Sequence, residues 1–234
     1  MRIGILGTGT LATALATGWT RAGHDVSIAG RSFERAEVAA KASGARARWL
    51  PEVVDADAVL LSVHWEGIAD ILTAAGAVAR SLAGKPLIDP TNAVEHGIGV
   101  LRTERGRAIA HLVADLAPGA HVTKAFNLFP ATTWMTSAPS PVTVAMCGND
   151  QGALEITGSL VRDVGGVPAV LGGLDRARQL EEAAGFVISL AFAGVDPQSA
   201  IPAVPSSGAD ETPQPAARRG GRSAVGAVEV PQST

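Results

Sequence analysis

The order of residues at the N-terminus constrains the fold of this chain more than any other feature. An apolar run, Arg2–Leu6, leads directly into the segment Gly7-Thr8-Gly9-Thr10-Leu11-Ala12. A strand, a glycine turn and a helix start in this order form the G-x-G-x-x-A version of the dinucleotide-binding fingerprint. Gly7 permits the tight turn, Gly9 leaves room for a pyrophosphate, and Ala12 lets the helix pack close to the strand. We therefore expect a dinucleotide here, bound by Gly7, Thr8, Gly9, Thr10 and Leu11, and the alternative is a tight turn without a ligand.

The end of the second predicted strand indicates which dinucleotide binds. This strand, Asp25–Ala29, is followed by Gly30-Arg31-Ser32, and the acidic residue that binds the ribose hydroxyls of NAD is missing. A guanidinium and a hydroxyl suit a 2′-phosphate instead, and Arg35 adds a second positive charge one turn further on. The sequence thus predicts NADP(H) held by Arg31, Ser32 and Arg35. The alternative is that both arginines belong to a solvated helix start.

Composition narrows the class of protein. The 234 residues include 47% hydrophobic side chains, enough for a full core, and carry a net charge of −3. This charge argues against nucleic acid or a membrane as the main partner. We find no signal-peptide pattern and no apolar run long enough to span a bilayer. The single cysteine, Cys147, is expected to pack as a small apolar residue in a reducing cytoplasm.

Strand and helix patterns alternate as far as about residue 193. Predicted strands cover residues 2–6, 25–29, 46–49, 57–63, 85–89, 121–126, 142–147 and 167–171. Predicted helices cover residues 10–22, 66–82, 103–116, 151–164 and 175–193, with a further helix that Ser32 caps and Gly44 ends. This order predicts an α/β fold, a Rossmann-type doubly wound and mostly parallel sheet with a small C-terminal α/β extension.

We expect three parts along the chain. Residues 1–140 form the NADP-binding Rossmann domain, residues 141–204 form the small extension, and residues 205–234 form a tail. The tail is rich in Pro, Gly, Ser and Ala, so it cannot bury enough surface to offset its ordering entropy and is predicted to be disordered. Its arginines, in Arg218-Arg219-Gly220-Gly221-Arg222, are interpreted as part of a solvated linker rather than an interaction motif.

The chain is poor in acid–base groups. It has no Tyr, which excludes the tyrosine–lysine pair of short-chain dehydrogenases, and it has only three lysines. Ligands bind at the carboxyl ends of strands in such sheets, whereas Lys41 lies on a helix and Lys85 opens a strand. Lys124 lies near a strand end, where a structural ion pair and a catalytic role are both open.

Four residues at strand ends are candidates for contact with the nicotinamide or the substrate: Val63, His64, Asn92 and Asn127. The imidazole of His64 can act as an acid or a base, although a polar packing role is the alternative. Asn92 and Asn127 can hydrogen-bond a carboxamide or a substrate but cannot shuttle protons. No side chain is a certain catalyst, and His64 and Asn127 are the candidates. We find no metal-ligand pattern. Such a site suits hydride transfer between two cofactors, for which the protein mainly has to position two rings.

The chain resembles the NADPH-dependent coenzyme F420 reductases. The resemblance rests on five segments: residues 7–11, residues 30–32 with Arg35, residues 63–66, residues 144–150 and residues 172–178. It implies hydride transfer between NADP(H) and coenzyme F420, a deazaflavin co-substrate, in a homodimer. It also implies that the C-terminal extension closes the deazaflavin cleft, and that the NADP phosphates are contacted by Thr8, Thr10, Arg31, Ser32 and Arg35.

Three positions depart from the pattern of that family. Gly30 stands where some members have a serine, His64 replaces a common proline, and Asn127 stands where archaeal members tend to have a histidine.

Two other functions are open on the sequence. An NADPH-dependent reductase of a small imine or carbonyl substrate would use His64 or Lys124 as its proton donor. A non-catalytic NADP(H)-binding sensor would bind the nucleotide and pass a signal through its tail.

Overall fold

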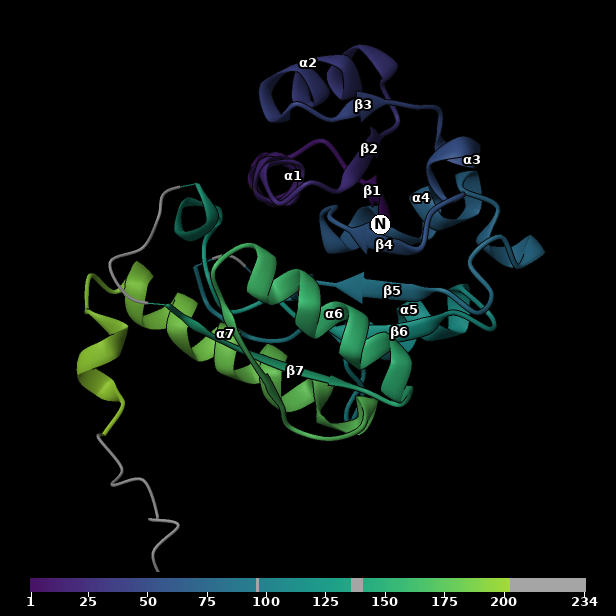
Figure 1. Ribbon diagram of the computed structural model, residues 1–234. Coiled ribbons are helices and arrows are strands. Elements are labelled where there is room, and N and C mark those ends of the chain that lie inside the picture. The colour runs from purple at the N-terminus through teal and green to yellow at the C-terminus, as the bar shows by residue number, and fades with distance from the viewer. Residues whose placement is uncertain (96, 136–140, 203–234) are drawn as a thin grey trace, which may run out of the picture. The chain divides into compact units, whose positions relative to one another are not determined.

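The computed structural model describes residues 1–95, 97–135 and 141–202 (Figure 1). Contacts between residues divide the chain into one unit over Met1–Pro197 and a second over Gln198–Thr234. Of the second unit, residues 198–202 are described, and they include the end of a 3-10 helix over Pro197–Ala200. The predicted tail, residues 205–234, lies outside the described residues.

The described part of the first unit is built on one eight-stranded sheet with the order β3-β2-β1-β4-β5-β6-β7-β8. The strands are β1 (Arg2–Leu6), β2 (Asp25–Ala29), β3 (Arg46–Ala47), β4 (Ala58–Leu61), β5 (Pro86–Asp89), β6 (His121–Lys124), β7 (Thr143–Gly148) and β8 (Val167–Val170). Neighbouring strands run parallel except β6 and β7, where Lys124 pairs with Cys147 in the antiparallel sense. The predicted mostly parallel, doubly wound sheet is confirmed. The predicted boundaries at residues 140 and 204 stay predictions.

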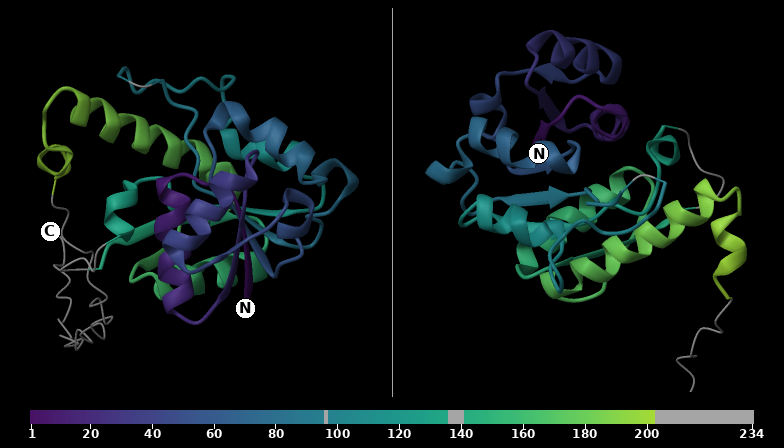
Figure 2. Two further views of the ribbon diagram at one scale, coloured as in Figure 1. Left: turned by 90° about the horizontal axis from the view of Figure 1, so that it is seen from above. Right: turned by 180° about the vertical axis from the view of Figure 1, so that it is seen from behind.

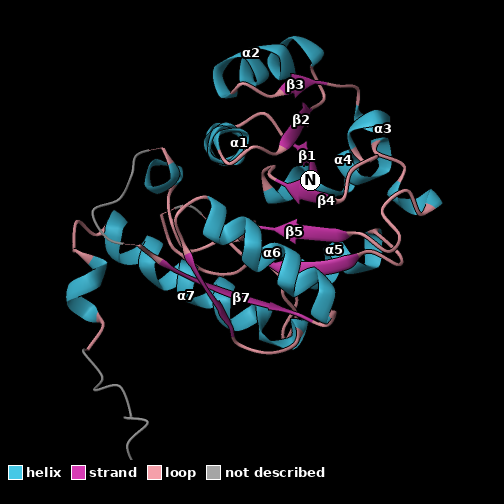
Figure 3. Ribbon diagram, in the orientation of Figure 1, coloured by secondary structure: helices cyan, strands magenta, loops and turns pink. Residues whose placement is uncertain are grey.

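Helices cover both faces of this sheet, as Figures 2 and 3 show. The α-helices are α1 (Thr10–Arg21), α2 (Phe33–Ser43), α3 (Leu50–Val53), α4 (Ile68–Ala74), α5 (Ile109–Leu116), α6 (Gln151–Asp163) and α7 (Ala177–Phe192). Side chains of α1, α2 and α6 form one buried apolar cluster with the sheet, and side chains of α3, α4, α5 and α7 form the other. Each strand of the middle of the sheet is therefore buried on both sides, as its continuous apolar sequence predicts.

Trp19 joins the beginning of the chain to a helix far along it. Its side chain is fully buried, and its Nε1 donates a hydrogen bond to the Leu160 carbonyl oxygen of α6 at 2.9 Å. Its ring meets the edge of Phe126 with 6.1 Å between ring centroids. The helix of the glycine turn is thus held to α6 as well as to the sheet.

Two predicted helices are shorter in the structure. The helix predicted over residues 66–82 divides into a 3-10 turn (Trp65–Gly67), α4 and a second 3-10 turn (Ala77–Ala79), because Gly76 has φ +78° and ends the helical path. The helix predicted over residues 103–116 begins only at Ile109, after Gly106 with φ +82°. Leu112, which the periodicity places on its apolar face, is 42% exposed.

One helix was not predicted. The four residues of α3 are too few to show helical periodicity, although Pro51 in the first turn fits a helix start. This helix packs on β1 at Gly4, where an added Cβ would lie 2.1 Å from the Val53 carbonyl oxygen. The close approach of helix and strand therefore depends on a glycine inside β1.

We predict that Gly4→Ala destabilises the protein by about 1–3 kcal/mol, the usual cost of overpacking a core. The added methyl group forces α3 away from β1, and urea denaturation measures the change. Gly67→Ala is the matched control, because a Cβ there meets no atom within 4 Å and the residue has φ −92°. Equal unfolding midpoints for both variants would contradict the prediction.

Candidate functional site

The glycine turn between β1 and α1 has the geometry that the fingerprint requires. Gly7 has φ +133°, and a Cβ there would lie 1.8 Å from the Ser62 carbonyl oxygen at the end of β4. Gly9 has φ −81°, and a Cβ on it would meet no atom within 4 Å. Ala12 is fully buried. The packing of the turn against β4 therefore requires a glycine at position 7. At Gly9 no protein atom requires a glycine, and the missing side chain leaves space for a ligand at the N-terminus of α1.

A cavity of about 760 Å³ opens at this turn. Its described lining residues follow the carboxyl ends of four strands, except Ile71, which lies in α4. They are Gly7, Thr8, Gly9, Thr10, Leu11, Gly30, Arg31, Ser32, Arg35, Ser62, Val63, His64, Ile71, Pro90 and Thr91. The structure thus brings together every residue predicted to bind the cofactor except Asn92. The described lining includes two arginines and no carboxylate, so its charge suits a phosphate-bearing ligand.

The end of β2 supplies the groups that fit a 2′-phosphate. Ser32 caps α2, and its Oγ accepts a hydrogen bond from the Arg35 backbone N–H at 3.3 Å. The hydroxyl proton of Ser32 can therefore point to a phosphate oxygen while its lone pair serves the cap. A Cβ on Gly30 would lie 2.9 Å from Cγ2 of Thr8, so the glycine here lets Thr8 keep its place in the cavity wall.

His64 and Val63 lie beside the glycine turn, directly after β4. The His64 side chain is 56% exposed, and its Nδ1 lies 3.6 Å from Oε2 of Glu66. His64 therefore reaches the cavity from its rim and is well exposed to solvent. Its position fits contact with a bound nucleotide, and its catalytic role stays a prediction.

Asn92 and Asn127 bind each other. Nδ2 of Asn127 donates to Oδ1 of Asn92 at 3.0 Å and to the Leu180 carbonyl oxygen at 3.0 Å, and Nδ2 of Asn92 donates to the Asn127 carbonyl oxygen at 2.8 Å. Oδ1 of Asn127 is buried without a hydrogen-bond partner in the described part of the chain. The preceding Phe126 has φ +65°, an unfavourable conformation for a bulky residue. Neither asparagine is among the described residues that line the cavity.

Lys124 is a fully buried cation at the end of β6. Its Nζ donates to Oδ2 of Asp89 at 3.0 Å, to Oε1 of Glu181 at 2.8 Å and to the Thr91 carbonyl oxygen. Burial alone would lower the pKa of Lys124, but the Coulombic attraction of the two carboxylates outweighs it and raises the pKa above its ordinary value. Of the two roles left open for Lys124, the structure therefore favours the ion pair.

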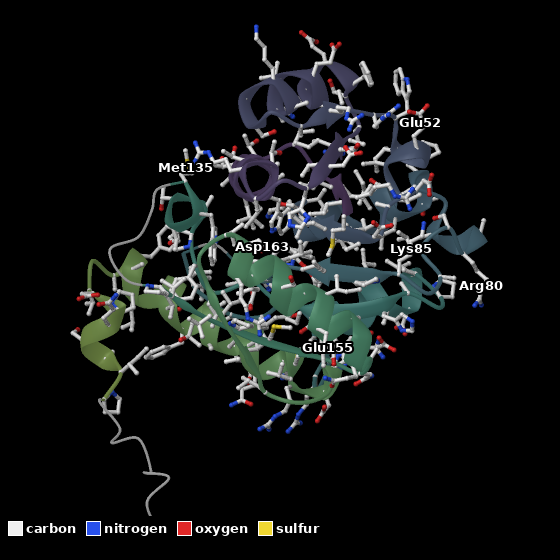
Figure 4. All side chains as sticks on the ribbon, in the orientation of Figure 1. Glu52, Arg80, Lys85, Met135, Glu155 and Asp163 are labelled. Atoms are coloured by element: carbon white, nitrogen blue, oxygen red, sulfur yellow. The ribbon has the colours of Figure 1, made fainter. Side chains whose placement is uncertain are left out.

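The other two lysines lie away from the cavity. Lys41 is exposed on α2. Lys85 precedes β5 at the opposite end of that strand from Pro90, and its Nζ donates to the Val54 carbonyl oxygen (Figure 4). Cys147 is also unsuited to chemistry, because burial raises the pKa of its thiol to about 11. The prediction that Cys147 packs as a buried apolar residue is confirmed.

Comparison with known proteins shows which of them the part of the chain around the cavity resembles. Residues 2–93 match the family described as NADP oxidoreductase, coenzyme F420-dependent. The resemblance to this family is confirmed. The matched residues contain the glycine turn and both arginines of the cavity.

One curated relative and two solved structures extend the similarity beyond this domain. The rat (Rattus norvegicus) metalloreductase STEAP3 is 29% identical over 184 residues, which are 77% of this chain but 36% of the relative, so the chain spans about a third of its length. The hypothetical protein SMa0349 of Sinorhizobium meliloti is 28% identical with a TM-score of 0.66, covering 74% of this chain and 85% of that one. A protein of Arthrobacter sp. FB24, whose proposed identity is an F420-dependent NADP reductase, shares the fold at 24% identity with a TM-score of 0.71. That match covers 82% of this chain and 95% of the Arthrobacter chain. In the described residues, no helix is long and apolar enough to cross a membrane.

We predict that Gly9→Ala keeps the stability of the protein and weakens NADPH binding by about tenfold or more, equivalent to at least about 1.4 kcal/mol. The new methyl group meets no protein atom and occupies space that a pyrophosphate needs. Titration calorimetry with NADPH measures the affinity, and thermal denaturation of the unliganded protein measures the stability. Gly67→Ala again serves as the control, and wild-type affinity in Gly9→Ala would contradict this role for Gly9.

Proposed function

We propose that this protein transfers a hydride between NADP(H) and a deazaflavin, coenzyme F420. The observation that carries the proposal is a cavity lined by the glycine turn, by Ser32 and by two arginines, with few groups that could donate a proton to a substrate. Its described lining holds one histidine, His64, and no carboxylate, lysine or cysteine. The family match over residues 2–93 supports the choice of co-substrate.

In this proposal NADP(H) lies along the described cavity. Gly7–Leu11 would hold the pyrophosphate at the N-terminus of α1. Arg31, Ser32 and Arg35 would hold the 2′-phosphate at the end of β2. The nicotinamide half would then lie toward the ends of β4 and β5, where Val63 and Thr91 form the wall.

Hydride transfer between two rings places modest demands on side chains. The bound nicotinamide supplies or accepts the hydride, and the protein has to hold the second ring against it at the right distance. Reduction of an imine or a carbonyl needs a proton donor in addition. Lys124 is a poor donor, because two carboxylates hold its proton and its side chain is fully buried. The scarcity of such groups favours the deazaflavin over those substrates.

The direct test is an absorbance assay with purified protein, NADPH and oxidised F420. We expect the visible absorbance of the deazaflavin to fall with time, and to return when NADP⁺ is added in excess to reduced F420. A mixture without protein gives the background rate. A rate no higher than this background, with NADPH shown to bind, would overturn F420 as the co-substrate.

The cofactor assignment has a test of its own. We predict that Arg31→Gln weakens NADPH binding by about 10- to 100-fold, since charge-assisted hydrogen bonds contribute about 1.5–3 kcal/mol. Binding of NADH, which has no 2′-phosphate, is expected to change little. Arg162→Gln, on the exposed part of α6, is the control for loss of a positive charge elsewhere. An equal loss of affinity for NADPH and NADH would mean that Arg31 does not bind the 2′-phosphate.

A further inference from the structure

A buried charged cluster lies behind the nicotinamide end of the cavity. It consists of Asp89 at the end of β5, Lys124 at the end of β6 and Glu181 in α7, and all three side chains are fully buried. The three hydrogen bonds of the Lys124 ammonium go to Asp89, to Glu181 and to the Thr91 carbonyl oxygen. None of the three charged residues is among the described residues that line the cavity.

The cluster holds one lining residue, Thr91, at several points. Oδ1 of Asp89 accepts hydrogen bonds from the Thr91 backbone N–H at 2.8 Å and from its Oγ1 at 2.5 Å. The carbonyl oxygen of Thr91 accepts from Lys124. Both polar backbone groups and the hydroxyl of Thr91 are therefore bound to the cluster, so the position of Thr91 in the cavity wall depends on Asp89 and Lys124.

Stability alone does not account for the cluster. Burying three charges costs desolvation energy, and buried ion pairs can often be replaced by apolar side chains without loss of stability. Two carboxylates against one ammonium also leave an excess negative charge. Glu181 reduces its cost by accepting hydrogen bonds from the backbone N–H groups of Ile109 and Ala110 at the start of α5, at 2.9 and 3.3 Å. The arrangement thus joins β5, β6, α5 and α7 around Thr91.

We propose that Asp89 and Lys124 are positioning residues, which fix Thr91 against the nicotinamide half of bound NADP(H), and that Glu181 holds Lys124 in place from α7. This inference rests on the NADP(H) binding of the proposed function and is independent of the identity of the hydride partner. It makes the carboxyl end of β5 the part of the wall that aligns the reacting ring.

The experiment compares two ligands with one variant. Thr91→Val keeps the shape of the side chain and removes the hydrogen bond of its hydroxyl to Asp89, while the bond from its backbone N–H remains. We expect the Kd for NADPH to rise by about tenfold, the effect of about 1.4 kcal/mol of lost interaction. The Kd for adenosine 2′,5′-bisphosphate, which has the adenosine half alone, is expected to stay the same. Thr91→Ser retains the hydroxyl, so its affinity for NADPH is expected to equal that of the wild type.

The matched control is Thr157→Val. Oγ1 of Thr157 is hydrogen-bonded to Oγ1 of Thr123 at 2.9 Å, fully buried, and Thr157 lies outside the described cavity lining. This variant loses a comparable buried hydroxyl contact, and its affinity for both ligands should equal that of the wild type.

Three results would separate the alternatives. Wild-type affinity for NADPH in Thr91→Val, or an equal loss for both ligands, would overturn the positioning role. Failure of the wild-type protein to bind NADPH would instead overturn the proposed function. Lys124→Met is expected to repeat the ligand-selective loss where it folds, and the Thr91 variants decide the question where it does not.

Discussion

The contact between the Gly7 turn and the end of β4 determines where this protein can bind a ligand. The Ser62 carbonyl oxygen occupies the place that a side chain on Gly7 would take. The turn therefore lies flat against the neighbouring strand, and α1 begins directly above the carboxyl edge of the sheet. The residues at its start line the cavity, and the ends of β2, β4 and β5 complete the wall. A larger residue at this one position would displace the helix start from the edge where all the other groups converge.

Charge is distributed very differently at the two ends of the cavity. At the β2 end, Arg31 and Arg35 are on the surface, where they can attract an anion and exchange it with solvent. At the β5 end, the charges of Lys124 and its two carboxylates are fully buried and satisfied by one another. Exposed charges suit recognition of a phosphate, whereas buried and paired charges suit a fixed geometry. This contrast agrees with a nucleotide that is recognised at its adenosine half and aligned at its nicotinamide half.

Local patterns in the sequence were sufficient to predict the sheet, the glycine turn and most of the residues that line the described cavity. The roles predicted for Gly7, Gly9, Arg31 and Ser32 depend on their own backbone or side chain, so adjacent residues were enough to predict them. The lengths predicted for the helices near Gly76 and Gly106 were wrong. Apolar periodicity continues through these positions, but a glycine in a left-handed conformation interrupts the helix at each of them. Glu181 could not have been found in this way. It lies 57 residues from Lys124 in the sequence, and only the packing of α7 on the ends of β5 and β6 brings the two together.

The position of Glu181 has a consequence for the order in which the protein matures on the ribosome. The residues that line the described cavity all precede β6 in the sequence, but before α7 is synthesised Lys124 and Asp89 lack the carboxylate and the helix that enclose them. The amide groups at the start of α5 also lack their acceptor until α7 arrives. A chain that ends after β6 therefore lacks both the Glu181 partner of Lys124 and the α6 partner of Trp19. The helix α7, among the last elements that the structure describes, completes the cluster that holds Thr91.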